Sequence, residues 1–200
     1  MKMYKKVMAA ALAGVMTVSM SATAFAADDD GYILKATNED SKSSDNDLVI
    51  AIEGSVSSMD PANIPDTNAI SATRGVYETL VSFDENQELT GKLAESWEVS
   101  DDSLTYTFKL RQGVKFQDGT DFNAAAVKAN YDRVVNKDNN LRQRRTFIVT
   151  NEDGSETPRV DSIETPDDYT LVIKLTQAWA PFINRLTQFC IISPAALEEY

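Results

Sequence analysis

Two segments of the chain alternate strictly between apolar and polar residues. Residues 104–110 (LTYTFKL) and residues 169–175 (YTLVIKL) both place a large apolar side chain at every second position. A period of two is typical of a strand that buries one face and exposes the other. The pattern therefore predicts two half-buried strands, and we expect them to share a sheet.

Shorter apolar runs predict further elements on the N-terminal side. Residues 48–52 (LVIAI) form a continuous apolar run that favours a buried strand, and residues 81–83 and 94–99 are expected to be short strands. Residues 55–63 are expected to be a loop that ends in an Asp-Pro turn. A helix should follow, with Asp66 or Thr67 as its N-cap. We expect its apolar stripe to contain the residues that recur at helical spacing, which are Ile70, Thr73, Tyr77 and Leu80 with Val76 beside them.

Residues 110–134 (LRQGVKFQDGTDFNAAAVKANYDRV) predict a strand, an Asp-Gly turn and a capped helix. Gly119 is expected to adopt a positive φ in the turn. Asn123 is a good N-cap, and Phe122 and Val127 are spaced for a hydrophobic staple. Val127, Tyr131 and Val134 should then form the buried face of the helix.

The first 26 residues have the features of a secretory signal peptide. A basic start (MKMYKK) precedes a short apolar stretch, and Ala24-Phe25-Ala26 supplies small residues for cleavage after Ala26. An uncleaved anchor is the alternative. Val15 stands where a lipoprotein would carry its lipidated cysteine, so lipidation there is not expected. Residues 27–47 are acidic and polar, which predicts a flexible linker.

Composition excludes several classes of function. Nineteen Lys and Arg residues against 31 Asp and Glu give a net charge of −12, and such an acidic chain is a poor partner for nucleic acid. There is no histidine, which excludes Ser-His-Asp and Cys-His catalysis and all histidine-based metal sites. The single cysteine, Cys190, lies in an apolar run and is expected to be a small buried residue. No catalytic motif is present, so we expect a protein that is not an enzyme and needs no cofactor or metal.

Three polar clusters allow a functional and a structural interpretation. Glu95 and Glu98 are an acid pair, for which a solvated surface is the simpler interpretation. Residues 151–154 (NEDG) are similar to part of a calcium loop, but a hairpin turn is favoured because the later glutamate of an EF-hand is missing. Arg142, Arg144 and Arg145 could hold an anionic ligand group through their paired donors, or they form a solvated basic loop.

Several motifs occur in the order found in one protein family. They are residues 57–61 (SSMDP), 77–81 (YETLV), 93–97 (LAESW), 116–120 (FQDGT), 180–182 (APF) and 192–197 (ISPAAL). Together they make the chain similar to the extracytoplasmic solute-binding proteins of ABC importers, family 5, the peptide/nickel type. The likeness spans residues 48–200. The segments FQDGTDFNAAAVKAN and ISPAALE are most similar to the corresponding segments of members that bind glutathione or dipeptides.

The resemblance implies a mixed α/β fold of the periplasmic-binding-protein type (type II, with an extra small domain). Family members are much longer, so we expect this chain to hold only an N-terminal portion. Residues 48–66 would be the first segment of the large lobe, residues 67–188 the small accessory domain, and residues 189–200 the start of the return. In the family the loop after the first strand borders the ligand. The residues of this chain that match it are Gly54, Ser55, Val56, Ser57 and Ser58.

By the same resemblance, the protein is expected to bind a small molecule or short peptide as a periplasmic or secreted monomer. It would deliver that ligand to the membrane permease of an ABC transporter, with peptides or glutathione-like solutes as cargo. Two alternatives stay open within the family. One is a sensor that docks on a membrane receptor, and the other is a binder of nickel or another solute. A secreted hydrolase is the third class, which the absence of histidine and of a nucleophile motif disfavours.

Overall fold

The computed structural model describes residues 54–198. The predicted signal peptide (1–26), linker (27–47) and first strand (48–52) lie outside these residues. The described elements, in chain order, are η2 (Pro61–Asn63), α2 (Thr67–Arg74), β1 (Glu78–Thr79), β2 (Val81–Phe83), β3 (Leu89–Gly91), β4 (Ala94–Val99), β5 (Thr105–Leu110), α3 (Ala124–Val135), η3 (Lys137–Asn139), α4 (Arg144–Phe147), β6 (Ile148–Thr150), β7 (Glu156–Pro158), β8 (Val160–Asp167), β9 (Thr170–Leu175), α5 (Phe182–Leu186), β10 (Cys190–Ile191) and α6 (Pro194–Glu198). No helix within residues 54–198 is long and apolar enough to cross a membrane.

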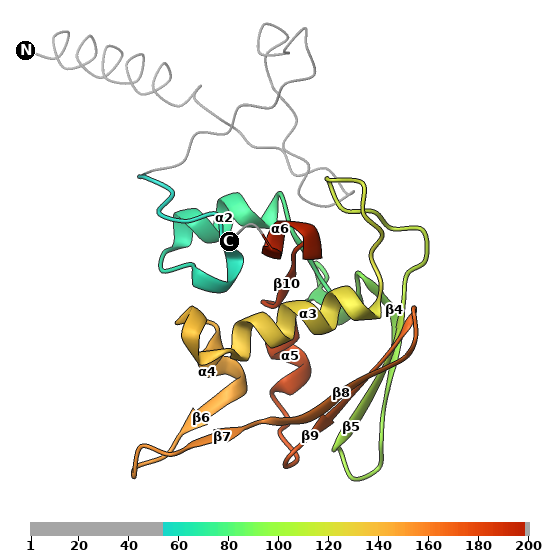
Figure 1. Cartoon of the computed structure of the whole chain (residues 1–200). Helices are drawn as coiled ribbons and strands as arrows, with labels where there is room; N and C mark the ends of the chain where they lie inside the picture. The colour runs from blue at the N-terminus through green and yellow to red at the C-terminus, as the bar shows by residue number, and fades with distance from the viewer. Residues whose placement is uncertain (1–53, 199–200) are drawn as a thin grey trace, which may run out of the picture. The chain divides into compact units, whose positions relative to one another are not determined.

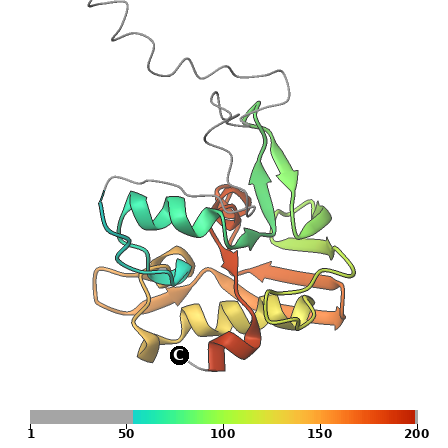
Figure 2. The same ribbon diagram turned by 90° about the horizontal axis from the view of Figure 1, so that it is seen from above.

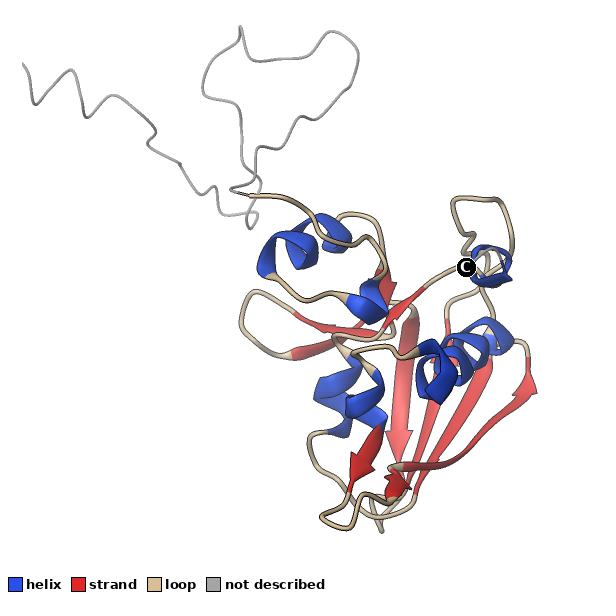
Figure 3. Cartoon of the chain, turned by 60° about the vertical axis from the view of Figure 1, so that its left-hand side comes forward, coloured by secondary structure: helices blue, strands red, loops and turns tan. Residues whose placement is uncertain are grey.

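A four-stranded antiparallel sheet organises the core, in the order β4-β5-β9-β8. The two alternating segments of the sequence form its neighbouring central strands, with Phe108 opposite Leu171. Their apolar positions are buried, whereas Lys109 and Lys174 point to solvent. Helix α3 packs against the buried face (Figures 1 and 3). The predicted pair of half-buried strands in one sheet is confirmed.

Three short antiparallel pairs complete the strand structure, namely β1 with β10, β2 with β3, and β6 with β7. The β6–β7 pair is a hairpin whose turn contains Gly154 at φ 80°. This confirms the hairpin interpretation of residues 151–154. Strand β10 lies between α2 and α3 (Figures 1 and 2), where it pairs with β1 and contacts α3.

Helix α2 confirms one half of its prediction and corrects the other. Asp66 is the N-cap, and its carboxylate accepts a hydrogen bond from the Ala69 N–H at 2.8 Å. The helix ends at Arg74, before the last two positions of the predicted stripe. Its buried residues are Ala69 and Thr73, and Ile70 is 40% exposed. The predicted apolar stripe is wrong because the helix ends before Gly75. Residues after Gly75 therefore do not extend the buried face of α2.

The strand–turn–helix segment has the expected caps but a shorter strand. Strand β5 ends at Leu110, and the chain then runs irregularly into the turn. Gly119 has φ 87°, and the Asn123 side chain accepts a hydrogen bond from the Ala126 N–H at 2.9 Å. Phe122 and Val127 are both buried in the core, as a staple requires.

A buried amide on α3 holds the segment that follows β10. Asn130 is 3% exposed, and its Nδ2 donates to the carbonyls of Ala126 at 2.9 Å and of Ile192 at 2.7 Å. Its Oδ1 accepts from the Ile192 N–H at 3.0 Å. Both backbone polar groups of Ile192 are therefore bonded to one side chain.

A second contact joins the Asp-Gly turn to the same segment. The Ser193 hydroxyl donates to the Asp118 carboxylate and lies 3.1 Å from the Thr120 hydroxyl. The hydrogen bond from Ser193, followed by those from Thr120, holds the pKa of Asp118 below its ordinary value. The FQDGT and ISP motifs, more than 70 residues apart, are thus one structural unit.

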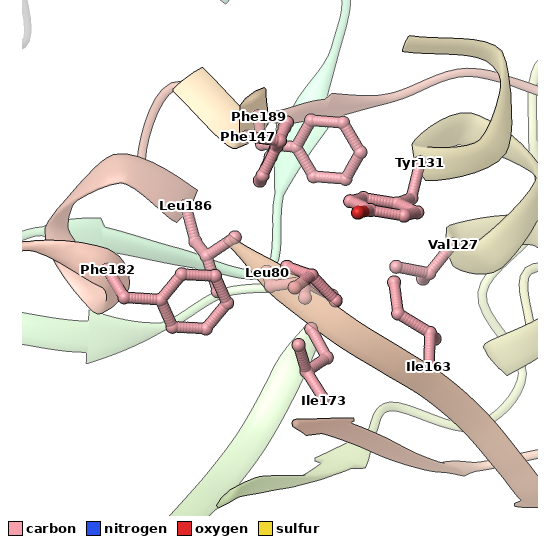
Figure 4. Close-up of a pocket in the computed structure, with 10 residues that line it drawn as sticks. Leu80, Val127, Tyr131, Phe147, Ile163, Ile173, Phe182, Leu186 and Phe189 are labelled. Atoms are coloured by element: carbon pink, nitrogen blue, oxygen red, sulfur yellow. The ribbon is translucent and has the colours of Figure 1, made fainter. Parts of the chain in front are cut away.

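The interior void shown in Figure 4 is a feature of packing. Its volume is about 10 Å³ and its lining is wholly apolar, with aromatic and aliphatic side chains from α3, α4, α5 and the sheet. A space of this size with no polar partner holds neither a solute nor a bonded water. Burial raises the pKa of Tyr131, which lines the void, to about 12. This void is therefore not a candidate site.

Candidate functional site

The loop predicted to border the ligand is exposed and is anchored at its C-terminal end. Gly54, Ser55, Val56 and Ser57 are exposed, and Ser58 is half-buried. Gly54 has φ 105°, a conformation that favours glycine. The loop residues therefore present backbone groups and small hydroxyls to solvent.

The hydroxyls of this loop also have structural partners. Ser57 donates to the Asp66 carboxylate, and Ser58 accepts a hydrogen bond from the Asp60 N–H at 3.1 Å. The bond from Ser57, together with that from the Ala69 N–H, holds the pKa of Asp66 below its ordinary value. Ser57 and Ser58 thus support the residues that cap α2 and η2.

An ion pair fixes the end of the loop to α3. The Nη1 and Nη2 atoms of Arg133 donate to the two carboxylate oxygens of Asp60, at 3.1 and 2.7 Å. Both side chains are largely shielded from water, with 17% and 29% of their surfaces exposed. The same carboxylate accepts a hydrogen bond from the Ala62 N–H and caps η2. Sequence analysis treated the Asp-Pro turn as a loop ending and did not identify this partner, because the two residues are 73 positions apart.

A surface groove of about 880 Å³ begins immediately after this loop. Its lining comes from η2, α2, β1, β2 and the residues that follow them up to Lys92, and from a second set of residues at positions 142, 143, 145, 146, 187, 188 and 190. The predicted residues 54–58 are not among its lining residues. Helices α2 and α4, which both contribute lining residues, lie on the same side of the molecule (Figure 1). The groove is open to solvent and far larger than the interior void, which has a volume of about 10 Å³.

The floor and walls of the groove combine apolar and basic groups. Ile64, Ile70 and Phe83 contribute apolar surface, and Phe83 is 43% exposed. The basic side chains are Arg74, Lys92, Arg142 and Arg145, and the acidic ones are Glu78 and Asp84. Solute sites commonly join an apolar lining to a few polar groups that orient the ligand.

The three arginines that the sequence singled out have different roles. Arg144 forms a bidentate pair with Glu156 at 2.6 and 2.8 Å and also donates to the Val135 carbonyl. The hydrogen bonds from Arg144 hold the pKa of Glu156 below its ordinary value. Arg142 and Arg145 are exposed and line the groove. The anion-holding hypothesis therefore applies to these two, and Arg144 is a structural residue.

Other candidate chemistry gains no support. Residues 54–197 contain no group of three or more His, Cys, Asp or Glu side chains that could hold a metal ion. Cys190 lines the groove and is half-buried rather than fully buried, and burial raises its pKa to about 11. A thiol with such a pKa is a weak nucleophile near neutral pH.

Comparison with known proteins identifies the family. The family model described as "Bacterial extracellular solute-binding proteins, family 5 Middle" matches residues 88–199. The chain belongs to this family. The glutathione-binding protein GsiB of Escherichia coli K12 is 38% identical to it over 189 residues, which cover 94% of this chain and 31% of GsiB. The chain thus spans about a third of the length of the curated relatives that it matches.

Solved structures of family relatives match the described fold. AgaA of A. tumefaciens R10, solved with agropinic acid, aligns with a TM-score of 0.64 and 29% identity over 73% of this chain and 28% of its own. The murein tripeptide binding protein MppA of E. coli aligns with a TM-score of 0.64 and 27% identity, over 74% of this chain and 31% of its own. The expected periplasmic-binding-protein fold is confirmed for the portion that the chain contains.

The groove contains residues that sequence reasoning did not select. Arg74 and Lys92 were assigned no role, and Gln143 and Gln188 were not considered. These residues come from four separate segments, so no local pattern in the sequence marks them. The one available signal was the excess of arginine at positions 142–145 in an otherwise acidic chain.

Proposed function

We propose that this protein is the extracytoplasmic substrate-binding component of an ABC importer that takes up peptides or glutathione-like solutes. The observation that carries the proposal is the 38% identity to glutathione-binding proteins, which extends over 94% of this chain. The family description as extracellular proteins and the signal-peptide features of residues 1–26 support an extracytoplasmic location. The partner is a membrane permease, and the protein binds its cargo without changing it.

Ligand contacts are proposed at the loop of residues 54–58 and along the adjoining groove. The loop offers exposed backbone groups, and the groove offers apolar surface beside basic side chains. Among the relatives, GsiB is a glutathione-binding protein, MppA is a murein tripeptide binding protein, and AgaA was solved with agropinic acid. A peptide-like solute fits this combination because it carries both charged ends and apolar side chains.

The division into a first lobe segment (48–66), an accessory domain (67–188) and a return segment (189–200) remains part of the proposal. Contacts across these limits, such as β1 with β10, are compatible with segments that pack on one another. The protein is proposed to act as a monomer. Light scattering of the secreted chain checks this point directly.

A nuclear magnetic resonance titration tests the function. The ¹⁵N-labelled chain is titrated with glutathione, dipeptides, a murein tripeptide and a nickel chelate, and with a neutral sugar of similar size as the control. We expect at least one peptide-like solute to give saturable shifts at residues 54–58 or in the groove, and the sugar to give none. Absence of saturable shifts with every solute at millimolar concentration would contradict the proposal for this chain.

A further inference from the structure

Two Asp-Gly dipeptides of the described residues, at positions 118–119 and 153–154, lie in turns with the same hydrogen bonds. In each turn the glycine N–H donates to the carbonyl three residues before it, at 2.9 and 3.0 Å, and the glycine φ is 87° or 80°. The residue after the glycine, Thr120 or Ser155, donates its N–H and its hydroxyl to one oxygen of the aspartate. The two turns therefore form a matched pair within one chain.

An Asp-Gly bond can rearrange without an enzyme or a co-reactant. The glycine nitrogen attacks the side-chain Cγ of the aspartate, and its proton leaves together with the hydroxyl of the protonated carboxyl as one water molecule. A water molecule then adds to the main-chain carbonyl of the resulting cyclic imide and opens the ring. The chain now continues through the side-chain carbonyl, as a β-aspartyl linkage. Glycine favours the attack because it has no Cβ to hinder the approach to its nitrogen.

The turn at Asp118 is bonded to two distant segments of the chain. The hydroxyl of Ser193, which is only 6% exposed, donates to the second carboxylate oxygen of Asp118. The Gln117 side chain donates to the Val76 carbonyl at 2.8 Å. The carboxyl of Asp118 must leave Ser193 as well as Thr120 before the glycine nitrogen can attack it. A hydrogen bond to a charged group shifts such an opening equilibrium by about tenfold.

The turn at Asp153 has no comparable anchor. In the described part of the chain, the hydrogen bonds of residues 151–155 all have their partners within the β6–β7 hairpin. Residues 150–158 are exposed, and each strand of the hairpin has only three residues. The hairpin lies at the edge of the described fold (Figure 1). A short, solvent-exposed hairpin opens locally at low cost, so the carboxyl of Asp153 reaches the glycine nitrogen more often than that of Asp118.

We propose that Asp153 is a site of spontaneous β-aspartyl modification in the folded protein, and that Ser193 protects Asp118 from the same reaction. The inference does not rest on the proposed solute-binding function. The modification adds one carbon atom to the main chain within the turn that precedes β7. Glu156 in β7 pairs with Arg144, the first residue of α4, at 2.6 and 2.8 Å. The longer turn displaces Glu156 and loosens the start of α4.

Peptide mapping of the aged chain tests the site. The full chain is kept folded at physiological temperature for several weeks and digested, and mass spectrometry after chromatography measures the β-aspartyl content at each Asp-Gly bond. We expect the content at Asp153 to exceed that at Asp118 about tenfold. In guanidinium chloride the two bonds should react at similar rates, because each glycine is followed by a small residue with a hydroxyl group. Amide hydrogen exchange of residues 144–147 should be faster in the aged chain than in the fresh one.

Two serine variants complete the test. S193A removes the tertiary hydrogen bond and should raise the rate at Asp118 about tenfold while the rate at Asp153 stays unchanged. S155A is the matched control, because it removes a hydroxyl bonded to Asp153 and should raise the rate at Asp153 alone. Dispersed amide spectra verify that both variants fold. Slow amide exchange at Ile192 verifies that Asn130 still holds the segment beside position 193.

Several outcomes would overturn the proposal. Equal β-aspartyl content at the two bonds of the folded chain would overturn the assignment to Asp153. A preference for Asp153 that persists in guanidinium chloride would do the same, because it would then come from the sequence and not from the fold. An unchanged rate at Asp118 in folded S193A would remove the role of Ser193. Unchanged exchange at residues 144–147 would remove the effect on α4. Solute binding is measured separately and is not affected by any of these results.

Discussion

Replacement of Asn130 is expected to cost more stability than any other single polar substitution on α3. The side chain makes three hydrogen bonds while only 3% exposed, and two of them satisfy the N–H and C=O of Ile192. In N130A these backbone groups lose their partners, and a buried unsatisfied group costs about 1–3 kcal/mol. Alanine regains about 0.5 kcal/mol in helix propensity. We therefore expect the free energy of unfolding to fall by about 2–4 kcal/mol.

Urea denaturation followed by tryptophan fluorescence measures this loss. The control is N139A, because Asn139 is exposed and makes one side-chain hydrogen bond, to the Arg133 carbonyl at 2.8 Å. Its loss should cost no more than about 1 kcal/mol. If the free energy of unfolding of N130A lies within about 0.5 kcal/mol of the parent value, the hydrogen bonds between Asn130 and Ile192 contribute little to stability. The reasoning would then be refuted.

The substitution N130D adds a test with a defined sign. The new carboxylate can still accept from the Ile192 N–H, but its second oxygen faces the carbonyls of Ala126 and Ile192. Only the protonated form can donate there, so the folded-state pKa should lie above the unfolded value of about 3.9. The folded state then binds more protons, and stability relative to the parent should fall as the pH rises through this interval. A pH-independent difference would contradict this geometry.

Three further changes have expected outcomes. Replacing Arg133 with Met should lower the free energy of unfolding by about 1–3 kcal/mol and speed amide hydrogen exchange near Asp60, because a largely shielded carboxylate loses its bidentate partner. Unchanged hydrogen exchange near Asp60 would contradict this expectation. The pKa of about 11 for Cys190 predicts that alkylation by iodoacetamide at pH 8 is about a hundredfold slower than for a free cysteine and rises tenfold per pH unit up to about pH 11. Replacing Gly119 with Ala should cost about 1–2 kcal/mol because φ is 87°, whereas the same change at Gly75, which has a helical backbone, should cost nothing.

The parts of the fold that were predictable are those governed by local interactions. Alternation places Phe108 and Leu171 on the buried face of one sheet, and a cap is a contact within one turn, so Asp66 and Asn123 were recognisable. The stripe on α2 was wrong because helical spacing continues in the sequence after the helix has ended. Periodicity alone does not show where Gly75 stops it.

The candidate site was only partly predictable, because its contacts join distant segments. The basic run at residues 142–145 indicated anion binding. The sequence could not show that Arg144 pairs with Glu156, whereas Arg142 and Arg145 line the groove. Ile70, which the sequence analysis expects in the apolar stripe of a helix, is exposed and lines the groove. It is an apolar residue on a surface that is open to a ligand.

The family motifs hold a backbone segment in place, whereas most residues that line the groove lie outside these motifs. Asp118 and Ser193 are hydrogen-bonded to each other, and Asn130 holds the residue beside Ser193, so residues of the family motifs fix the segment of residues 190–197. That segment includes β10, and Cys190 in β10 lines the groove. The shared motifs thus fix the segment that carries Cys190, whereas the charged residues of the groove lie elsewhere in the sequence. Substitutions at Asn130 should therefore alter the groove from a distance, because they free the segment that carries Cys190 without changing any side chain that lines the groove.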